Sequence, residues 1–499
     1  MRVSRMLCLI AAVLACSRGA GAQTPAVSAP LARFVTDLLA AGGRVDSTAA
    51  VELGDFLLPL QLGAVPSRFN QSLGLQLATT PFDVGLETSK PGFEAVPAHY
   101  GFGPSFTMHA GAIGRGKTSV SFNYQNVSQG SIDGIGLDSF KLGFVLTPPP
   151  SLRAQYGREA VQESLALRLQ QDVASFGLVY GVTDRLDVGV GVPIVHVEME
   201  GQVRSQVFGP TYTLTPRPPN IPPDAHFFDV YPATPAPAAG CSTSEIDITG
   251  VNHAPDQVAL FDMVELASRV ITRKCKASGL GDVVGHVRYR VTSSATNAIA
   301  VGVDARLPTG DADQLLGTGG TRATASVVWT GRSGRFLPHA SAGYTYAIGN
   351  GSSQFNQVTS CVASSPSAPS TRATTCSVIA SPTPLDLKLP SEINLAGGTD
   401  MVFYRRLTIA GDLFARLARN LTTFTVNDST ASALLPGDPT VPGTLLQTKG
   451  TNATLLVGVA AAQVALTDRT VLKANLMFPV GGDGLSPRMA FGAGLGVRY

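Results

Sequence analysis

The C-terminal residues 488–499 alternate between apolar side chains and small or basic ones. Met489, Phe491, Leu495 and Tyr499 occupy odd positions, whereas the even positions hold glycine, alanine or arginine. A two-residue period places successive side chains on opposite faces of a β-strand. The segment is also longer than the roughly 9 to 11 residues that cross a bilayer as a tilted strand. One apolar face and one glycine-rich face are typical of a transmembrane barrel strand whose apolar face meets lipid.

The same alternation recurs at residues 282–291, 299–306, 407–418 and 472–478, and the charged side chains fall on one face only. In a membrane barrel this face lines the interior, called here the lumen. Because the charges have both signs, we expect salt bridges along the lumen wall or to a plug, with a substrate site as the alternative. The predicted lumen-lining residues are Asp282, His286, Arg288, Arg290, Asp304, Arg306, Asp400, Asp412 and Arg416.

The connections between these segments are alternately short and long. Short turns are expected at 183–186, 292–296, 331–335, 405–406 and 467–469. The long connections include 201–278, 349–389 and 422–450, which we expect to be external loops. Outer-membrane barrels have short periplasmic turns and long external loops, whereas periodicity alone also fits a soluble barrel with its charged face outward.

This alternation of connections fixes the direction of each strand and constrains the strand count. An even count with a periplasmic N-terminus requires an upward strand before 118–127, and residues 105–113 are the candidate. The sequence therefore predicts an all-β fold, a transmembrane antiparallel β-barrel of about 14 strands over residues 104–499. Twelve strands is the alternative, if residues 139–147 belong to an external loop.

The N-terminal residues predict export. Arg2 and Arg5 precede an apolar run, and Ala20-Gly21-Ala22 forms a signal-peptidase site, which defines residues 1–22 as a signal peptide and Gln23 as the mature start. Together with the barrel strands, this signal predicts location in the bacterial outer membrane, in contact with its lipid. Cys16 offers a poorer alternative as a lipoprotein acceptor, because Leu14 is bulky for its position.

Residues 23–103 do not show the barrel pattern. An apolar stripe from Leu31 to Leu39 predicts a short helix that Ser28 caps and Gly42 ends. This stripe must pack against another surface. The segment is therefore expected to form either a plug, together with residues 57–62 and 73–77, or a small periplasmic cap.

Four cysteines remain after removal of the signal peptide. An even number in an exported chain favours disulfides, and the local pairing joins Cys241 to Cys275 and Cys361 to Cys376. Each pair lies inside one long external loop. A zinc site built from these cysteines is the disfavoured alternative, because no Cys-x-x-Cys spacing occurs. We therefore predict no metal and no cofactor.

Composition narrows the function classes further. The chain is 44% hydrophobic and only 14% charged, with a formal net charge of +2, which disfavours nucleic acid as a partner. The sequence contains no run of about 18 apolar residues, so it predicts no membrane-spanning helix. Catalytic and nucleotide-binding motifs are missing, so we expect no enzyme. A barrel hydrolase that uses His286 is the enzymatic alternative.

Several short motifs resemble one bacterial outer-membrane family, described as the MetA-pathway of phenol degradation, over roughly residues 100–499. This family is similar in outline to the long-chain fatty-acid channels, which are 14-stranded barrels with an N-terminal plug. The resemblance implies passive uptake of small hydrophobic or aromatic compounds through the lumen. The motifs are IGRGK (113–117), FNYQ (122–125), YGVTDRLDVG (180–189), SGLGD (278–282), LPTGD (307–311) and LGTG (316–319).

The aromatic C-terminus adds a second resemblance. A last strand that ends on an aromatic residue is similar to the closing strand of bacterial outer-membrane barrels, which implies recognition of the strand ending at Tyr499 by the barrel assembly machinery. A different function remains open, because a surface receptor or adhesin-like barrel could carry its activity on the disulfide-stapled external loops.

Overall fold

The computed structural model describes most of the chain outside the N-terminus and several loops. The signal peptide predicted at 1–22 lies outside the described residues. The described ranges are 30–42, 45–46, 64–80, 109–138, 140–146, 159–210, 227–228, 241–248, 263–364, 373–380, 385–403, 407–427, 430–431, 441–442, 445–467 and 469–499.

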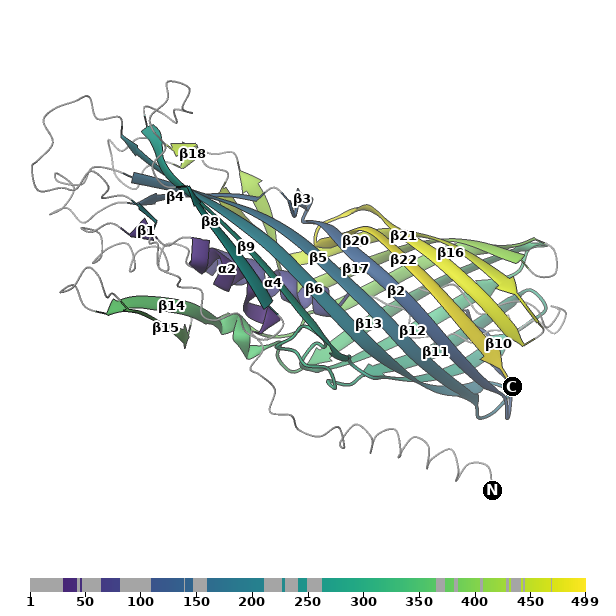
Figure 1. The fold of residues 1–499 in the computed structure, drawn as a ribbon. Helices are drawn as coiled ribbons and strands as arrows, with labels where there is room; N and C mark the ends of the chain where they lie inside the picture. Colours follow the sequence, from purple (N-terminus) through teal and green to yellow (C-terminus); the bar gives the residue numbers. More distant parts are fainter. Residues whose placement is uncertain are drawn as a thin grey trace, which may run out of the picture.

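The fold is all-β, a closed barrel of 12 antiparallel strands (Figure 1). The ring closes because β5 pairs with β2 along one edge and with β6 along the other. In ring order the strands are β5 (Glu159–Gly181), β2 (Thr118–Ile132), β22 (Leu485–Arg498), β21 (Thr470–Gly482), β20 (Leu445–Ala465), β17 (Leu407–Asn427), β16 (Ser391–Phe403), β13 (Phe336–Ile348), β12 (Thr321–Gly331), β11 (Asn297–Arg306), β10 (Val284–Ser293) and β6 (Leu186–Pro210).

Further elements lie outside this ring. β4 (Phe140–Leu146) pairs with β5, and β8 (Cys241–Ile248) pairs with β9 (Met263–Leu280), which in turn pairs with β6. The short strands are β1 (Val45–Asp46), β3 (Ile135–Gly136), β7 (Phe227–Phe228), β14 (Gln357–Ser364), β15 (Ala373–Ala380), β18 (Thr430–Ala431) and β19 (Val441–Pro442). The helices are η1 (Leu31–Arg33), α2 (Phe34–Gly42), α4 (Ala64–Ala78) and η2 (Ser353–Asn356).

The predicted count of 14 strands is corrected to 12, the alternative. β2 pairs directly with β5, with Thr118 opposite Tyr180, so the strand over 139–147 is excluded from the ring. The described part of the other candidate strand, residues 109–113, is not a strand. The period of a segment identifies it as a strand but does not determine its neighbours in the sheet. The predicted total of 14 therefore includes both segments.

The short connections gather at the end of the barrel that carries Tyr499, called here the turn end (Figure 1). At three of these turns a side-chain hydroxyl organises the reversal. Thr183, Ser294 and Thr467 each accept hydrogen bonds from the backbone N–H groups two and three residues later. Such hydroxyl turns offer the backbone a partner outside the strand ladder, so the strand ends there.

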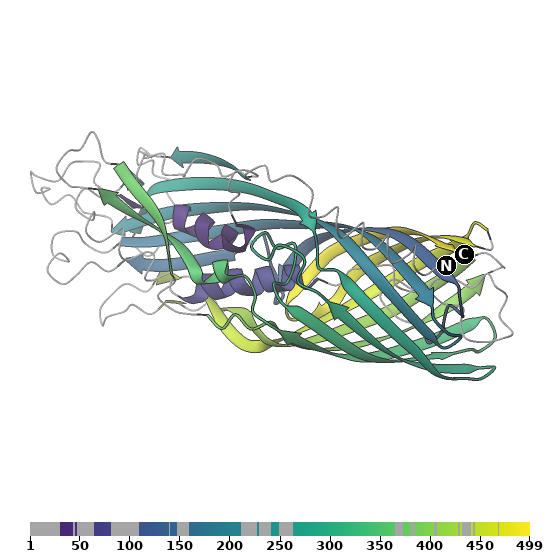
Figure 2. The ribbon, with the colours of Figure 1, turned by 90° about the horizontal axis from the view of Figure 1, so that it is seen from below.

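The strands at the opposite end, the loop end, are longer than the sequence indicates. β6 continues to Pro210 and β9 begins at Met263, so both enter the region expected as loop 201–278. β17 and β20 likewise reach into 422–450, and the region 349–389 contains the β14–β15 hairpin. Figure 2 shows these strands extending past the helices.

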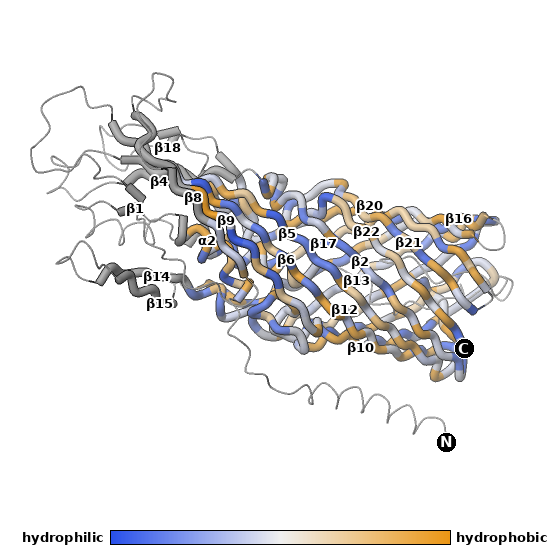
Figure 3. The backbone as a smooth tube through the Cα atoms, viewed as in Figure 1, coloured by the Kyte–Doolittle hydropathy of each residue, from blue (hydrophilic) through white to orange (hydrophobic). Residues whose placement is uncertain are grey.

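The outer surface near the turn end is apolar, and we call it the apolar belt. Hydrophobic and hydrophilic residues alternate along its strands (Figure 3). On β22 the odd positions face outward as predicted, with Met489 55%, Phe491 51% and Leu495 40% exposed, whereas Gly492 and Gly494 are buried. In the part of the chain that the structure describes, helices of the length and hydrophobicity needed to cross a membrane are absent.

The helices pack against the inner face of the long strands. α2 contacts β6 and β9, and α4 contacts β17, β20 and β22 (Figure 2). The apolar stripe predicted for the first helix is buried there, since Leu31, Phe34, Val35, Leu38 and Leu39 are each at most 2% exposed. Residues 57–62, the other expected part of a plug, lie outside the described residues. The helices thus supply an apolar core to the loop end.

Candidate functional site

A backbone segment, residues 109–113, crosses the lumen at the turn end. Ala110 N donates to Thr330 Oγ1 on β12 over 2.9 Å, and Ile113 N donates to both carboxylate oxygens of Asp187 on β6, at 3.1 and 3.2 Å. Ala110 and Ile113 are at most 1% exposed. Ala110 packs against Ala298 and Ala300 of β11 and Val328 of β12, so the segment lies close against the inner face of the wall.

Arg288 on β10 joins this segment to the wall. Its Nη1 donates to the carbonyl of His109 over 3.1 Å, and its Nη2 lies 3.7 Å from Asp187 Oδ2. The Arg288 side chain is 2% exposed and that of Asp187 is fully buried. A buried charge requires a partner, and these two residues satisfy each other while holding the crossing segment from both sides.

Two histidine–aspartate pairs lie next to the crossing segment. His109 Nε2 is 3.0 Å from Asp400 Oδ2 on β16, and His339 Nε2 is 2.7 Å from Asp412 Oδ1 on β17. The two imidazole rings contact each other edge to face, with their centroids 4.7 Å apart. Asp400 and Asp412, two of the predicted lumen-lining residues, are thus brought together by two histidines.

A second ionic cluster connects the wall to α4. Glu392 on β16 binds Arg322 over 2.6 Å through Oε2 and binds Arg416 through Oε1. Arg416 in turn donates to the carbonyl of Thr79 over 3.1 Å and to its hydroxyl over 2.6 Å, just after α4 ends. Arg306 faces Arg322 directly across the β11–β12 ladder. The cluster therefore fixes the end of the helix to the wall.

The remaining predicted residues have local roles. Asp282 accepts hydrogen bonds from Gly310 N and from the backbone and hydroxyl of Thr318, so it organises the loop at 307–320. His286 binds Asp304 across the β10–β11 ladder. Arg290 donates to the carbonyl of Asp184 at the turn end, where it supports a turn.

Sequence reasoning missed several residues of these clusters. His339 had a usable signal, since Tyr344 and Tyr346 of β13 face outward and strand parity then directs His339 inward. Counting by two along β16 from Asp400, which was predicted to face inward, likewise places Glu392 inward. No periodic pattern marks His109 or the end of α4, because a non-strand segment inside the lumen shares no parity with the wall.

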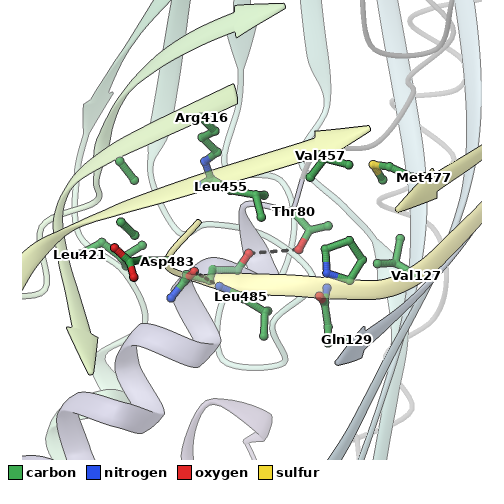
Figure 4. A pocket seen from close by; sticks show the side chains of 14 residues that line it. Thr80, Val127, Gln129, Arg416, Leu421, Leu455, Val457, Met477, Asp483 and Leu485 are labelled. Atoms are coloured by element: carbon green, nitrogen blue, oxygen red, sulfur yellow. Dashed lines mark hydrogen bonds between the residues drawn. The ribbon is translucent and has the colours of Figure 1, made fainter. Parts of the chain in front are cut away.

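An apolar pocket lies beside these polar clusters, between α4 and the inner faces of β2, β20, β21 and β22. Its volume open to a water-sized molecule is about 20 Å³, and about 470 Å³ lies free of atoms when the solvent at its open mouth is included. Figure 4 shows its lining side chains. Most lining side chains are apolar, and the polar ones come from α4 and the residues after it, from β2 and β17, and from the turn before β22. The lining residues are Gln76, Thr80, Val127, Gln129, Arg416, Ala418, Leu421, Ala453, Leu455, Val457, Met477, Asp483, Leu485 and Pro487.

The apolar floor of the pocket is built by strand parity. Val127, Leu455, Val457, Val459 and Met477 form one buried cluster and are at most 9% exposed. The intervening residues on the same strands face outward. This inner face is therefore apolar in one sector of a lumen whose other sectors are charged, an arrangement typical of a site for a small apolar ligand.

The loop-end rim of the pocket contains a partly buried carboxyl group. Asp133 follows β2 and accepts hydrogen bonds from Phe424 N over 2.8 Å and Gly484 N over 2.7 Å. Burial raises the pKa of Asp133 from 3.8 to about 6, and these two hydrogen bonds oppose the increase. At the turn before β22, Leu485 N donates a hydrogen bond to Gln76 Oε1 of α4. The rim thus joins three strands and a helix.

The cysteines are arranged near the loop end. The predicted disulfide between Cys241 and Cys275 is present and links β8 to β9. Cys361 and Cys376 lie opposite each other in the β14–β15 ladder, the register that local pairing requires. The second disulfide stays a prediction, because the side chains of this pair lie outside the described residues.

No family model matches the chain, and no curated protein matches its sequence. An outer membrane channel from Pseudomonas putida F1 is similar over 78% of this chain and 98% of that chain, with 12% identity and a TM-score of 0.38. The toluene transporter TbuX of Ralstonia pickettii covers 83% of this chain and 98% of its own, at 12% identity and a TM-score of 0.30. The monoaromatic hydrocarbon channel CymD covers 84% and 98%, at 8% identity and a TM-score of 0.33.

At these identities and TM-scores, the fold assignment rests on the strand pairing of the chain itself. The ring is closed, so its strands satisfy their backbone hydrogen bonds without free edges near the turn end. Its outer face there is apolar, and its inner face carries the charges and glycines. These features identify the chain as a transmembrane β-barrel of the bacterial outer-membrane type.

Proposed function

We propose that the protein is a channel for passive uptake of small hydrophobic or aromatic compounds across the outer membrane. The observation that carries this proposal is the apolar pocket inside the barrel. A lumen used only for water and ions gains nothing from an inner sector of valine, leucine and methionine. The names of the similar solved structures, which include a toluene transporter and a monoaromatic hydrocarbon channel, support the same class of cargo.

The predicted segment 23–103, through its described helices α2 and α4, acts as the plug in this proposal, together with residues 109–113. α2 and α4 fill the lumen near the loop end, and residues 109–113 cross it at the turn end. The pocket lies between these two obstructions. A bound compound therefore reaches the periplasm only after the crossing segment moves, and its attachments to Asp187, Arg288 and Thr330 control that step.

Cargo binding in the pocket is tested with two neighbouring residues of β21. Met477 lies in the pocket at 2% exposure, whereas Leu476 faces outward at 38% exposure. Met477→Trp fills the pocket, and Leu476→Trp adds the same side chain to the lipid face. We expect Met477→Trp to abolish retention of radiolabelled toluene in equilibrium dialysis and its uptake by cells, whereas Leu476→Trp keeps both.

Equal retention by the two variants would show that the pocket is not the binding site. A barrel that binds and transports none of toluene, naphthalene or octane would favour the alternative, a receptor whose loops carry the function. The braced loop end, with the Cys241–Cys275 bond, is the feature that favours this alternative. A catalytic activity forms no part of the proposal.

Recognition of the C-terminal strand by the barrel assembly machinery is also proposed. Tyr499 is 70% exposed at the turn end, and its backbone pairs with Thr118 of β2. Tyr499→Ala should reduce the amount of folded barrel in the outer membrane of living cells without lowering the stability of purified barrel. Tyr346→Ala, at an outward position of 56% exposure, is the control and should leave the amount unchanged.

A further inference from the structure

The contact between His109 and His339 is unusual because it joins the crossing segment to the barrel wall. Both side chains lie inside the barrel, and each residue is at most 3% exposed. The rings meet at an interplanar angle of 68°. Neither residue lines the apolar pocket or belongs to the Glu392 cluster. A role for this pair is therefore independent of the proposed cargo site.

Each imidazole uses its two nitrogens in the same way. His339 Nδ1 lies 3.1 Å from the carbonyl of Leu337, and its Nε2 points to Asp412. His109 Nδ1 lies 3.4 Å from Thr330 Oγ1, and its Nε2 points to Asp400. A carbonyl only accepts, so Nδ1 of His339 donates its proton to Leu337, and Nε2 shares a proton with Asp412. Histidines that bind metals are oriented by such a bond on the other nitrogen.

The two aspartates supply unused oxygen atoms at the same place. Asp400 Oδ1 and Asp412 Oδ2 are buried and have no hydrogen-bond partner among the described residues. Two carboxylates and two imidazoles therefore meet inside the barrel, and each carboxylate has one oxygen left over. A divalent cation that replaces the protons between the histidines and the aspartates pairs with the carboxylates and gives the unused oxygens a partner.

We propose that His109, His339 and Asp400 form a binding site for a divalent transition-metal ion, with Asp412 beside it to balance the charge. The candidate ligand atoms of the three residues all lie within 4.8 Å of one another. Zinc needs nitrogen and oxygen ligands at about 2.0 to 2.2 Å, so small side-chain rotations bring them to bonding distance. Two imidazoles with one carboxylate select zinc-like ions over calcium and magnesium.

The consequence of this site is a link between the N-terminal segment and the wall. His109 precedes β2 in the crossing segment, whereas His339 and Asp400 belong to β13 and β16. A bound ion joins the segment to two strands with bonds stronger than its hydrogen bonds. Metal binding therefore stabilises the folded barrel and holds the crossing segment in the lumen.

The site is tested on the untagged, full-length mature barrel in detergent, with zinc as the probe. The protein is treated with a chelator, desalted, loaded with Zn²⁺ and desalted again, and the retained zinc is measured by plasma emission spectrometry. We expect one zinc ion per chain and a higher unfolding temperature with zinc than without it. His109→Ala and His339→Ala should each lower the zinc affinity at least tenfold.

Two further variants keep the test decisive. Asp400→Asn preserves the size of the side chain, so it should keep the folded barrel, judged by its heat-modifiable gel mobility, and lose the zinc. His196→Ala is the matched control, because His196 lies on the outer face of β6 beside Ser278, and it should retain zinc fully. Wild-type barrel that retains no zinc overturns the proposal, as does equal retention by His339→Ala and His196→Ala.

Discussion

The turn end and the loop end of the barrel place the same strands in opposite surroundings. Near the turn end, β6 directs valines outward and Asp187 and glycines inward, as a membrane barrel requires. Beyond Ile194 the same strand directs Val195, Val197 and Met199 inward, and Glu198 and Glu200 outward. The odd-numbered residues of β6 face inward along both regions. The inner face, however, changes from polar to apolar, and the outer face changes from apolar to charged.

This reversal shows what the helices contribute. The inward residues near the loop end meet α2, where Leu38 and Phe34 approach Gly201. An apolar inner face has to be covered, and the helices cover it, whereas the outer face there carries charges. Near the turn end the charges face inward and pair with one another. One region is therefore built like a soluble protein and the other like a membrane barrel.

The largest expected effect comes from the ionic cluster between the barrel wall and α4. Glu392→Gln removes the charge that Arg322 and Arg416 share, and leaves two buried cations uncompensated. Breaking such a buried pair lowers the free energy of unfolding by about 3 to 5 kcal/mol. The measurement is urea unfolding in lipid vesicles, followed by the fluorescence of Trp329.

The matched control lies at the loop end. Glu198 binds the exposed Lys274 over 2.6 Å on the outer face, so Glu198→Gln should leave the unfolding curve nearly unchanged. Equal losses in the two variants would contradict the view that charges inside the barrel are buried, whereas those on the outer face near the loop end are solvated.

A charge placed on the outer face is expected to have the next largest effect. Val301 of β11 is 40% exposed in the apolar belt, whereas Gln202 of β6 is exposed beyond it. Val301→Arg should lower the free energy of unfolding in vesicles by about 2 to 4 kcal/mol, the cost of arginine on a lipid face. Gln202→Arg should change it by less than about 0.5 kcal/mol. If both positions tolerate arginine, the belt does not face lipid.

The contact between α2 and the wall gives a smaller effect. A Cβ atom added at Gly201 lies 2.4 Å from Leu38 Cδ2 and 2.9 Å from Phe34 Cε1, whereas one added at Gly411 meets nothing within 4 Å. Gly201→Val should therefore cost about 1 to 3 kcal/mol through overpacking and increase single-channel conductance as α2 moves. Gly411→Val should leave conductance unchanged. The reverse result would place α2 outside the conducting path.

The smallest effect concerns the pH dependence at the pocket rim. Because burial raises the pKa of Asp133 from 3.8 to about 6, the folded state binds this proton more tightly than the unfolded chain. The resulting stability is complete below about pH 4 and is lost as the pH rises through about 6. Asp133→Asn should flatten this part of the profile of unfolding temperature against pH. An unchanged profile would show that Asp133 does not titrate in this range.

Much of the wall was predictable from sequence because strand parity is local. The outward positions of β22 and the inward positions of Asp400, Asp412 and Arg416 follow from counting by two. The turns at Thr183 and Thr467 were also readable, since a hydroxyl at the first turn position is a local device. Partners across the lumen were not predictable, because the residues that meet there are far apart in sequence.

β4 and residues 109–113, the two segments that the structure removes from the predicted ring, show why strand pairing could not be predicted from sequence. β4 has the composition of a wall strand, but the direct pairing of β2 with β5 leaves it outside the ring. Residues 109–113 are apolar enough for a strand, yet their N–H groups bind Thr330 and Asp187 across the lumen. The partner of a strand depends on which strand edges remain unpaired after the other strands have associated. The sequence of one segment does not determine this.

The sequence by itself determined a barrel with an apolar exterior, charged interior positions and alternating short and long connections. These properties follow from side-chain period and turn chemistry, which act over a few residues. The tertiary structure alone decided the ring of 12 strands, the placement of α2 and α4 against the inner face, and the meeting of His109 with His339. Those outcomes depend on contacts between distant parts of the chain, which form only when the barrel closes.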